Sequence, residues 1–319
     1  MRILALVPGG IGDQILFFPT LDSLKRSFPK AEIDVVVDPT AVEAYRVSKV
    51  VHRIIPYNFE IRNSPADWAN LLGVIRDREY EVSLSLCNNW SINLLLWLTG
   101  IRTRVGYGQS ANPFFLTETV PRKPDQYLAH QFHDLLRGLG IATPCPDLAI
   151  NVPEEDIAWA DQDRAQLGLQ NRGYVLIYST ASSALETPDT HSYPAKNWTA
   201  IIQDFQKRQP DLPIVAIQTP ENQPLMSELT KRVPVLKISK PENLGQMAAL
   251  IAGADLMLCT ESDPMQLAVA LKVFTLGLFG SQDPTKLIPQ NERFLAIQSP
   301  TNKLSDIAAE DVLKKVWGE

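Results

Sequence analysis

Short apolar runs alternate along this chain with longer segments in which hydrophobic residues recur at helical spacing. The runs have the length of buried strands, and the longer segments carry apolar residues three and four positions apart. This alternation is typical of β-α-β units, in which helices connect parallel strands. In the first half, the predicted strands are residues 3–7, 33–37, 51–55, 82–86 and 104–106, and the predicted helices are residues 14–27, 40–47, 65–77, 89–99 and 126–139.

The alternation lapses once, in the connector formed by residues 141–153, which contains three prolines. Such a connector is typical of a domain boundary. We therefore expect an α/β protein with two doubly wound, Rossmann-like domains, residues 1–150 and 151–319, facing each other across a cleft. In the second half, the predicted strands are residues 174–178, 214–218, 235–238, 256–259, 274–278 and 294–297, and the predicted helices are residues 154–167, 196–208, 222–231, 243–252, 264–271 and 306–317.

Composition narrows the function classes. The 319 residues are 45% hydrophobic and 21% charged, as in soluble globular proteins, and the net charge of −6 argues against a nucleic-acid partner. The three cysteines form no C-x-x-C pair, so neither a disulfide framework nor a zinc site is expected. The N-terminal apolar run ends at Val7, too short for a signal peptide. We expect a cytoplasmic protein with at most peripheral membrane contact.

A glycine-rich loop with an aspartate follows the first predicted strand. It contains Gly9, Gly10 and Gly12, and Asp13 stands where the next helix begins. Backbone N–H groups and a helix N-terminus meet there, which favours an anion or a reacting polar group. Asp13 is therefore a candidate catalytic carboxylate, and the alternative is a helix N-cap.

Polar residues also follow the strands of the second half. Ser179 and Thr180 come after one strand and are candidate donors to phosphate oxygens. Lys196 lies in the first turn of a predicted helix, which the helix dipole disfavours unless an anion is bound there. Glu221 follows another strand and is a candidate for binding ribose hydroxyls. The alternatives are a solvated lysine at position 196 and a capping or surface role for Glu221.

A strand-to-helix corner near residue 260 is a further candidate. Glu261 and Ser262 occupy the corner, and Asp263 and Gln266 begin the helix. Asp263 precedes a proline and is equally interpreted as an N-cap. No D-x-D motif follows a strand and the histidines lack a third ligand, so neither a metal nor a cofactor is expected.

Five motifs follow one another along nearly the whole chain, and in this order they resemble glycosyltransferase family nine, the group of the ADP-heptose:lipopolysaccharide heptosyltransferases. That family has two Rossmann-like domains, the GT-B arrangement. The motifs are Gly12-Asp13 with Pro19 (G-D-x-x-x-x-x-P), residues 28–34 (the second-strand entry), Arg104–Tyr107 (R-x-G-[FY]), Lys196–Trp198 (K-x-W) and residues 267–284 (L-A-A-A-L…L-F-G-x-T-D-P).

The resemblance implies roles for particular residues. Asp13 falls on the family's general base, Lys196 on its phosphate-binding lysine and Glu221 on its nucleoside-binding carboxylate. It implies an inverting, metal-independent transfer of a heptose or hexose-like sugar from a nucleoside-diphosphate donor, held by the second domain, to a saccharide or lipid-linked saccharide acceptor on the first. The setting would be envelope lipopolysaccharide or polysaccharide synthesis at the inner face of the cytoplasmic membrane. Acceptor loops are expected at residues 88–90 and 108–115.

One motif departs from the family. Its D-T-G-x-x-H element reads Glu-Ser-Asp-Pro-Met-Gln here, which puts the additional carboxylate of Asp263 where a diphosphate is expected. A non-catalytic protein that binds a nucleotide, a saccharide or another protein is therefore the alternative. A nicotinamide-dependent dehydrogenase is a further one, since Gly10-Ile11-Gly12 opens a dinucleotide fingerprint, but Ile15 stands at its third glycine.

Overall fold

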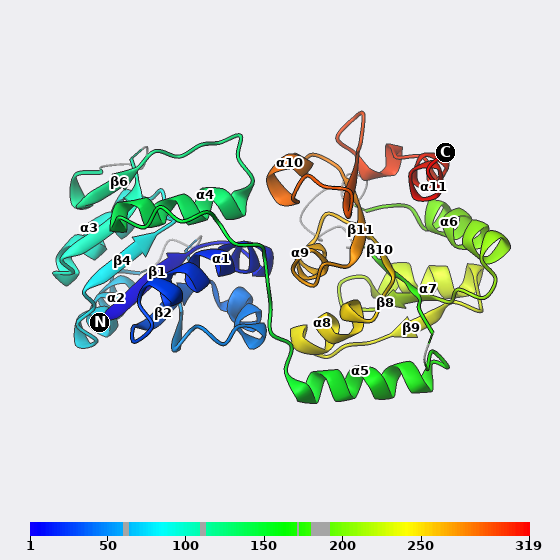
Figure 1. Cartoon of the computed structure of the whole chain (residues 1–319), viewed down its shortest axis with the longest axis horizontal. Coiled ribbons are helices and arrows are strands. Elements are labelled where there is room, and N and C mark those ends of the chain that lie inside the picture. Colours follow the sequence, from blue (N-terminus) through cyan, green and yellow to red (C-terminus); the bar gives the residue numbers. More distant parts are fainter. Residues whose placement is uncertain (60–63, 109–112, 171, 180–191) are drawn as a thin grey trace. The chain divides into compact units, whose positions relative to one another are not determined.

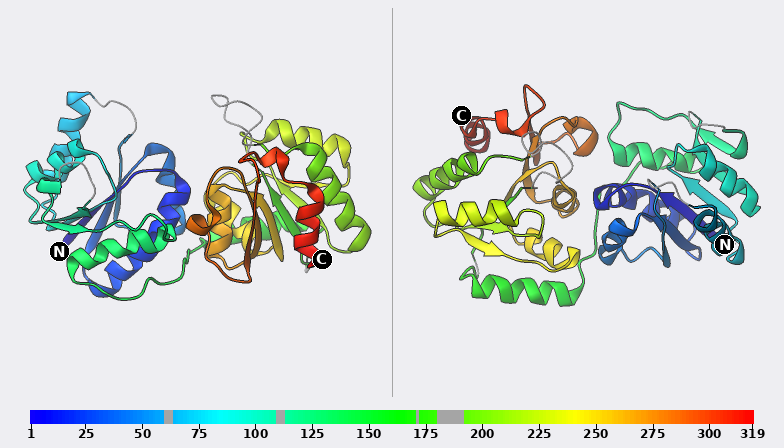
Figure 2. Two further views of the ribbon diagram at one scale, coloured as in Figure 1. Left: turned by 90° about the horizontal axis from the view of Figure 1, so that it is seen from above. Right: turned by 180° about the vertical axis from the view of Figure 1, so that it is seen from behind.

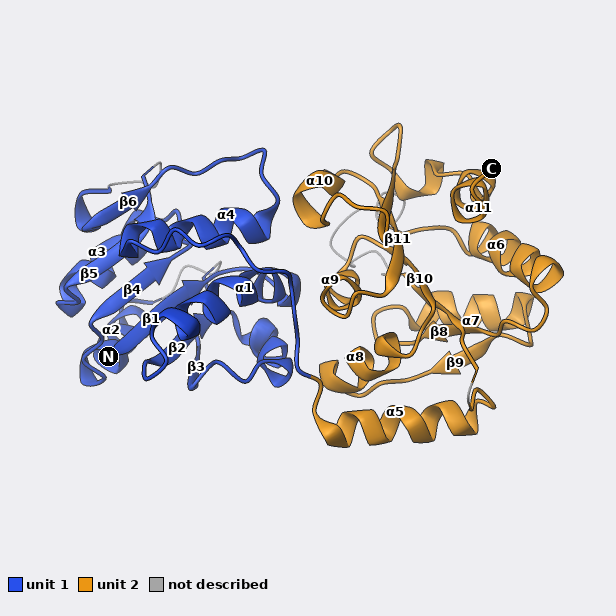
Figure 3. Cartoon of the chain, viewed as in Figure 1, with its two compact units in different colours: residues 1–151 blue, residues 152–319 orange. Residues whose placement is uncertain are grey.

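The computed structural model describes residues 1–59, 64–108, 113–170, 172–179 and 192–319. The chain divides into two compact units, Met1–Asn151 and Val152–Glu319 (Figure 3). Each unit contains one six-stranded sheet, and every strand pair within the two sheets is parallel (Figure 1). The predicted α/β class with two Rossmann-like sheets is confirmed.

The sheet of unit 1 has the strand order β3-β2-β1-β4-β5-β6. This is the order of dinucleotide-binding folds, and it reverses direction between β1 and β4. The strands are β1 (Arg2–Val7), β2 (Glu32–Val37), β3 (Arg53–Pro56), β4 (Val82–Ser85), β5 (Thr103–Tyr107) and β6 (Glu118–Val120). The helices are α1 (Ile11–Ser27), α2 (Pro65–Asp77), α3 (Trp90–Thr99) and α4 (Leu128–Asp134), with 3₁₀ segments η1 (Pro39–Val47), η2 (Pro113–Phe115) and η3 (Leu135–Leu139).

The sheet of unit 2 has the order β12-β11-β10-β7-β8-β9. Counted from its own first strand this is the same topology, and the reversal lies between β7 and β10. The strands are β7 (Val175–Tyr178), β8 (Ile214–Ile217), β9 (Lys237–Ser239), β10 (Leu256–Thr260), β11 (Phe274–Phe279) and β12 (Phe294–Gln298). The helices are α5 (Glu154–Gln166), α6 (Ala195–Arg208), α7 (Gln223–Arg232), α8 (Leu244–Ala252), α9 (Asp263–Ala270), α10 (Pro284–Leu287) and α11 (Ala309–Trp317), with the 3₁₀ segment η4 (Leu304–Asp306).

Helices cover both faces of each sheet (Figure 2). Strand β1 shows the consequence, because residues 3–7 are all fully buried, whichever face their side chains take. A continuous apolar run of this kind is typical of parallel strands between two helical layers. With both faces covered, the loops at the carboxyl ends of the strands are where ligands of such sheets bind.

The structure differs from the expected elements in short segments. Strand β6, with three residues, and helix α10, with four, are too short to show a hydrophobic period in the sequence. Residues 40–47 form a 3₁₀ helix, and the helix expected over 126–139 is an α-helix followed by a 3₁₀ turn. The last helix begins at Ala309, since residues before it form a separate turn.

Candidate functional site

The glycine loop of unit 1 lies at the point where the strand order reverses. Gly10 is the N-cap of α1, and Gly12 is a buried residue of its first turn. Asp13 is the third residue of the helix, and its Oδ2 accepts a hydrogen bond from the Gly10 N–H at 3.0 Å. Asp13 is therefore not the N-cap residue itself, but at the third position of the helix it takes part in the cap by accepting from the N–H of the N-cap residue Gly10. Its half-buried carboxylate folds back over the loop.

Gly9 accommodates this carboxylate. Its φ of +103° lies in the region that side chains rarely adopt, and a Cβ at this position would stand 2.2 Å from Asp13 Oδ2. Only glycine satisfies both conditions without a shift of the loop. The backbone and the aspartate thus depend on each other.

Gln14 and Tyr45, which the sequence reading did not select, fix the loop from the protein interior. Gln14 is fully buried, and its Nε2 donates to the carbonyl oxygens of Val7 at 3.0 Å and of Gly9 at 3.3 Å. The Tyr45 hydroxyl donates to Gln14 Oε1 at 2.8 Å, and burial raises the pKa of Tyr45. A signal was present in the sequence, because position 14 shares the helix face of the apolar positions 17, 18 and 21.

The reversal point of unit 2 brings two predicted loops together. Strands β7 and β10 are neighbours, with Tyr178 opposite Cys259 in the register. Ser179 follows β7 and is fully buried, and the segment 261–263 follows β10. Thr180 lies outside the described residues. The two loops therefore leave the same edge of the sheet side by side.

Helix α9 begins differently from expectation. Ser262 is its N-cap, with its Oγ donating to the Thr260 carbonyl at 2.9 Å, and Asp263 is the first helical residue. The interpretation of Asp263 as the N-cap is wrong. Its exposed carboxylate lies at the positive end of the helix dipole, which stabilises α9.

The other two residues of this corner are more enclosed. Gln266 is 3% exposed, and its Nε2 donates to the Leu287 carbonyl at 2.9 Å, joining α9 to α10. Glu261 is half-buried and lies close to Gly280. Its Oε1 is 3.4 Å from the position that a Cβ would occupy if Gly280 were replaced by a larger residue. The Gln266 amide thus braces the helix that carries Asp263.

Asn222, also not selected from the sequence, ties the neighbouring loops together. It is fully buried, and its Nδ2 donates to the carbonyls of Ser179 at 3.1 Å and Ile217 at 2.9 Å. Its Oδ1 accepts from the Thr219 N–H at 2.8 Å. The loop that carries the exposed Glu221 is thereby held against the end of β7.

Tyr178 shows that the predicted carboxylates gather at one edge. Burial raises the pKa of its hydroxyl to about 12, the Thr219 hydroxyl opposes this shift, and the negative charges of Glu221 and Asp263 add to it. Strand β7 lies between β8 and β10, so the loops that carry Glu221, after β8, and Asp263, after β10, flank the end of β7. The structure therefore groups Ser179, Glu221 and Asp263.

Lys196 has a different environment. It is exposed in the first turn of α6, as expected, and it lines a pocket of about 470 Å³ between α6 and α7. None of the other predicted donor-binding residues that the structure describes lines this pocket. The lining residues are Ser192, Pro194, Ala195, Lys196, Pro224, Leu225, Glu228 and Arg232.

Two Rossmann-type units in one chain, each with polar loops where its strand order reverses, define the GT-B fold. The chain belongs to glycosyltransferase family 9 (heptosyltransferase), whose model matches residues 68–317. The resemblance inferred from the motifs is confirmed, and the dehydrogenase alternative is not supported.

Two curated relatives differ in what their names describe. The photosynthetic NDH subunit of subcomplex B 1 from Arabidopsis thaliana is 22% identical and covers 96% of this chain and 71% of its own length. Lipopolysaccharide heptosyltransferase 3 from Escherichia coli K12 is 21% identical over 95% of this chain and 93% of its own. Similar sequences thus occur both as a transferase and as a subunit of a complex.

Solved structures share the fold. A family 9 glycosyl transferase from Veillonella parvula has a TM-score of 0.84 at 19% identity, covering 99% of this chain and 96% of its own. The E. coli heptosyltransferase WaaC with ADP has a TM-score of 0.75 at 18% identity, covering 100% and 97%. At such identities, the likeness establishes the fold alone.

Two glycine substitutions test the loop geometry. We expect Gly9→Ala to lower the free energy of unfolding by about 1–3 kcal/mol, because it forces both a strained φ and a collision with Asp13. Gly73→Ala, in the interior of α2 with open space around it, should raise that free energy by about 0.5–1 kcal/mol. Urea denaturation measures both, and equal effects would contradict the loop's dependence on Gly9.

Proposed function

We propose that this protein is an inverting, metal-independent glycosyltransferase of lipopolysaccharide or polysaccharide synthesis. Unit 1 binds a saccharide or lipid-linked saccharide acceptor, and unit 2 binds a nucleoside-diphosphate sugar carrying a heptose or hexose-like sugar. The observation that carries this proposal is the rigid loop that holds the Asp13 carboxylate at the reversal point of unit 1, in a chain of family 9.

Asp13 acts as the general base. Its carboxylate takes the proton from an acceptor hydroxyl, and the resulting oxygen attacks the anomeric carbon of the donor sugar. The bond from that carbon to the diphosphate oxygen breaks on the opposite face, so the configuration inverts. The hydrogen bond from the Gly10 N–H to Oδ2 supports this role, because it orients the carboxylate before substrate binds.

Unit 2 holds the donor. Glu221 accepts the ribose hydroxyls, and Thr180 donates to the diphosphate. Ser179 and Ser262 lie beside this site, but Ser179 is fully buried and the Ser262 hydroxyl donates to the Thr260 carbonyl, so the structure does not favour them as donors to the diphosphate. Lys196 and the N-terminus of α9 meet the charge that develops on the leaving group, in place of a metal ion. Glu261 and Gln266 form the side of the donor site at the start of α9. The E. coli heptosyltransferase structure with ADP supports an adenine nucleotide as the first donor to test.

Asp13→Asn tests the base. The amide keeps an oxygen that can accept from the Gly10 N–H, so the loop should fold, but the proton acceptor is lost. We expect kcat to fall by about 10²–10⁴-fold with little change in donor affinity. Asp77→Asn, at an exposed site on α2, is the control and should transfer sugar at the wild-type rate. Wild-type kcat in Asp13→Asn would exclude Asp13 as the base.

Calorimetric titration of ADP-, GDP-, UDP- and CDP-sugars tests the donor site. We expect one nucleotide class to bind with and without EDTA, and Lys196→Ala to weaken that binding by about tenfold, as the loss of one charged hydrogen bond predicts. Lys207→Ala, exposed at the other end of α6, should leave the affinity unchanged. Asp263→Gly should bind the diphosphate more tightly, because it removes a like charge.

A non-catalytic role is the second candidate. It is favoured by the Arabidopsis relative, which is named as a subunit of a complex, and by the carboxylate of Asp263 at the start of α9. A non-catalytic protein that binds a saccharide or another protein should bind none of the nucleotide sugars in the same titration. A non-catalytic nucleotide binder should bind one of them, but it has no transfer activity for Asp13→Asn to remove.

We also propose that the protein acts at the inner face of the cytoplasmic membrane. Among the described helices, none is long and apolar enough to cross a bilayer. Unit 1 exposes an aromatic patch that contains Trp97 and Phe114, of which Phe114 is 83% exposed. Phe115 joins the two, with its ring centroid 5.9 Å from each of theirs, tilted against Trp97 and edge-on to Phe114. Exposed tryptophan side chains favour the lipid headgroup region.

Flotation with anionic phospholipid vesicles tests this contact. We expect the double variant Trp97→Ser/Phe114→Ser to partition at least about tenfold more weakly, since two aromatic side chains no longer enter the interface. Phe274→Ser, which changes a half-exposed ring of unit 2, serves as the control. Equal partitioning of wild type and the double variant would rule out this patch as the membrane contact.

A further inference from the structure

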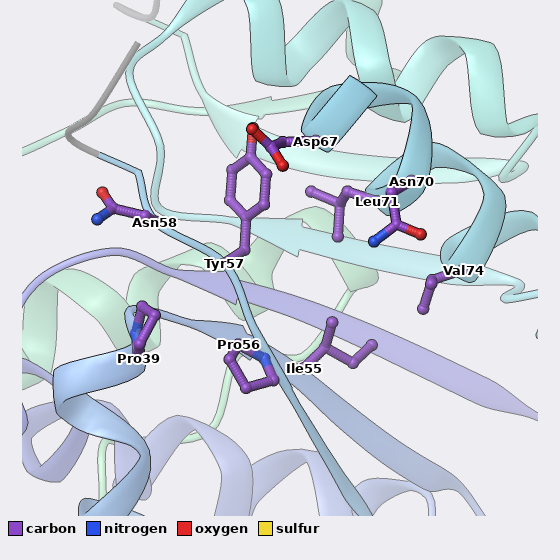
Figure 4. A pocket seen from close by; sticks show the side chains of 9 residues that line it. All are labelled: Pro39, Ile55, Pro56, Tyr57, Asn58, Asp67, Asn70, Leu71 and Val74. Atoms are coloured by element: carbon purple, nitrogen blue, oxygen red, sulfur yellow. The ribbon is translucent and has the colours of Figure 1, made fainter. Parts of the chain in front are cut away.

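A pocket of about 390 Å³ opens in unit 1 beside the edge strand β3 (Figure 4). Its volume is within the usual range for small-molecule sites. It lies outside the acceptor loops expected from the sequence, residues 88–90 and 108–115. The lining residues are Pro39, Ile55, Pro56, Tyr57, Asn58, Asp67, Asn70, Leu71 and Val74.

The floor and one wall of the pocket are apolar. Ile55 and Leu71 are buried, and the ring of Tyr57 stands between β3 and α2, where Figure 4 shows it directed toward Asp67. Phe59 packs edge-on against that ring at 5.3 Å. Tyr57 is 8% exposed, so its orientation is fixed by packing. The pocket thus offers a flat apolar surface that exists without a ligand.

The polar groups of the pocket are two amides and one carboxylate. Asn58 lies on the loop after β3, and Asp67 and Asn70 lie one turn apart on the first half of α2. Asp67 is positioned by its capping contacts, since its Oδ2 accepts from the Ser64 N–H at 3.1 Å and from the Ser64 Oγ at 2.8 Å. No lysine, arginine or histidine is among the lining residues that the structure describes.

This lining matches the chemistry of an uncharged sugar. A sugar ring presents C–H groups to apolar and aromatic surfaces and hydroxyls that both donate and accept hydrogen bonds. Amides can do both in return, and a carboxylate accepts two hydroxyls. A phosphate or carboxylate on the sugar would instead be repelled by the Asp67 carboxylate.

The pocket opens at the same edge of the sheet as Asp13. The register pairs Val7 with Val37 and Val37 with Pro56, so β1, β2 and β3 end at one level. Two strand spacings, on the order of 10 Å, separate the end of β1 from the end of β3. A saccharide chain seated in the pocket can therefore extend along the edge toward the Asp13 loop.

We propose that this pocket binds a neutral saccharide segment of the acceptor, so that the protein glycosylates an uncharged sugar chain rather than a phosphorylated or acidic one. The acceptor assignment rests on the proposed function, whereas the preference for uncharged sugar rests on the two amides and the negative charge of Asp67. The experiment therefore measures binding without any donor.

Protein-observed NMR titration with matched sugars is the test. The neutral probes are galactotriose, mannotriose and chitotriose, and trigalacturonate is the acidic counterpart of the first. We expect at least one neutral trisaccharide to bind, and trigalacturonate to bind more weakly than galactotriose. Asn70→Ala should weaken the neutral probe about 3- to 10-fold, the loss expected for one hydrogen bond. Arg76→Ala, exposed on the same helix outside the pocket, should have no effect.

A substitution of Asp67 tests whether its negative charge excludes acidic sugars. Asp67→Asn keeps an oxygen for the Ser64 cap, so α2 should fold, and it should raise the affinity for trigalacturonate while the neutral probe still binds. Failure of every neutral trisaccharide to bind, or equal affinity of galactotriose in wild type and Asn70→Ala when that probe binds, would overturn the inference. Transfer to acidic acceptors only would overturn it and leave the proposed function intact. If the protein binds the saccharide but transfers sugar from no donor, the proposed function is wrong and the saccharide site is still supported.

Discussion

The burial of parallel strands on both faces is the constraint on which the rest of this structure depends. Residues 3–7 of β1 show it, because all five are fully buried between two helical layers. Such strands have no room for polar side chains, so the chemistry of both units moves to the loops beyond the carboxyl ends. The Asp13 loop, Ser179, the Glu221 loop and the corner at residues 261–263 all lie at such ends.

In unit 1, several weak interactions together fix the conformation of the loop between β1 and α1. A positive φ at Gly9, a bond from the Gly10 N–H to Asp13 and the buried amide of Gln14 all act on the same few backbone atoms. No single one would hold a carboxylate at an exposed edge. Together they fix the carboxylate at the start of α1, where it also caps the helix.

The second unit carries a conflict of charge. Asp263 stabilises the start of α9, an effect of about 0.3–1 kcal/mol for an exposed carboxylate, while opposing a diphosphate at the same place. The relatives differ in what they are named for, since one is a heptosyltransferase and another a subunit of a photosynthetic complex. A shared fold is compatible with both, because function depends on the side chains at the loops.

The sequence by itself determined the fold class, the order of the longer elements and the family, because the period of a strand or helix and the spacing of motifs are local properties of the chain. It also indicated which loops carry polar residues. Only the tertiary structure decided that Asp13 follows a glycine N-cap, that Asn222 joins two loops and that Tyr178 lies near both Glu221 and Asp263. It alone revealed the pocket at β3, whose lining joins residues 39, 55–58 and 67–74. These features arise where segments far apart in the chain meet, and no local pattern records which segments will be neighbours.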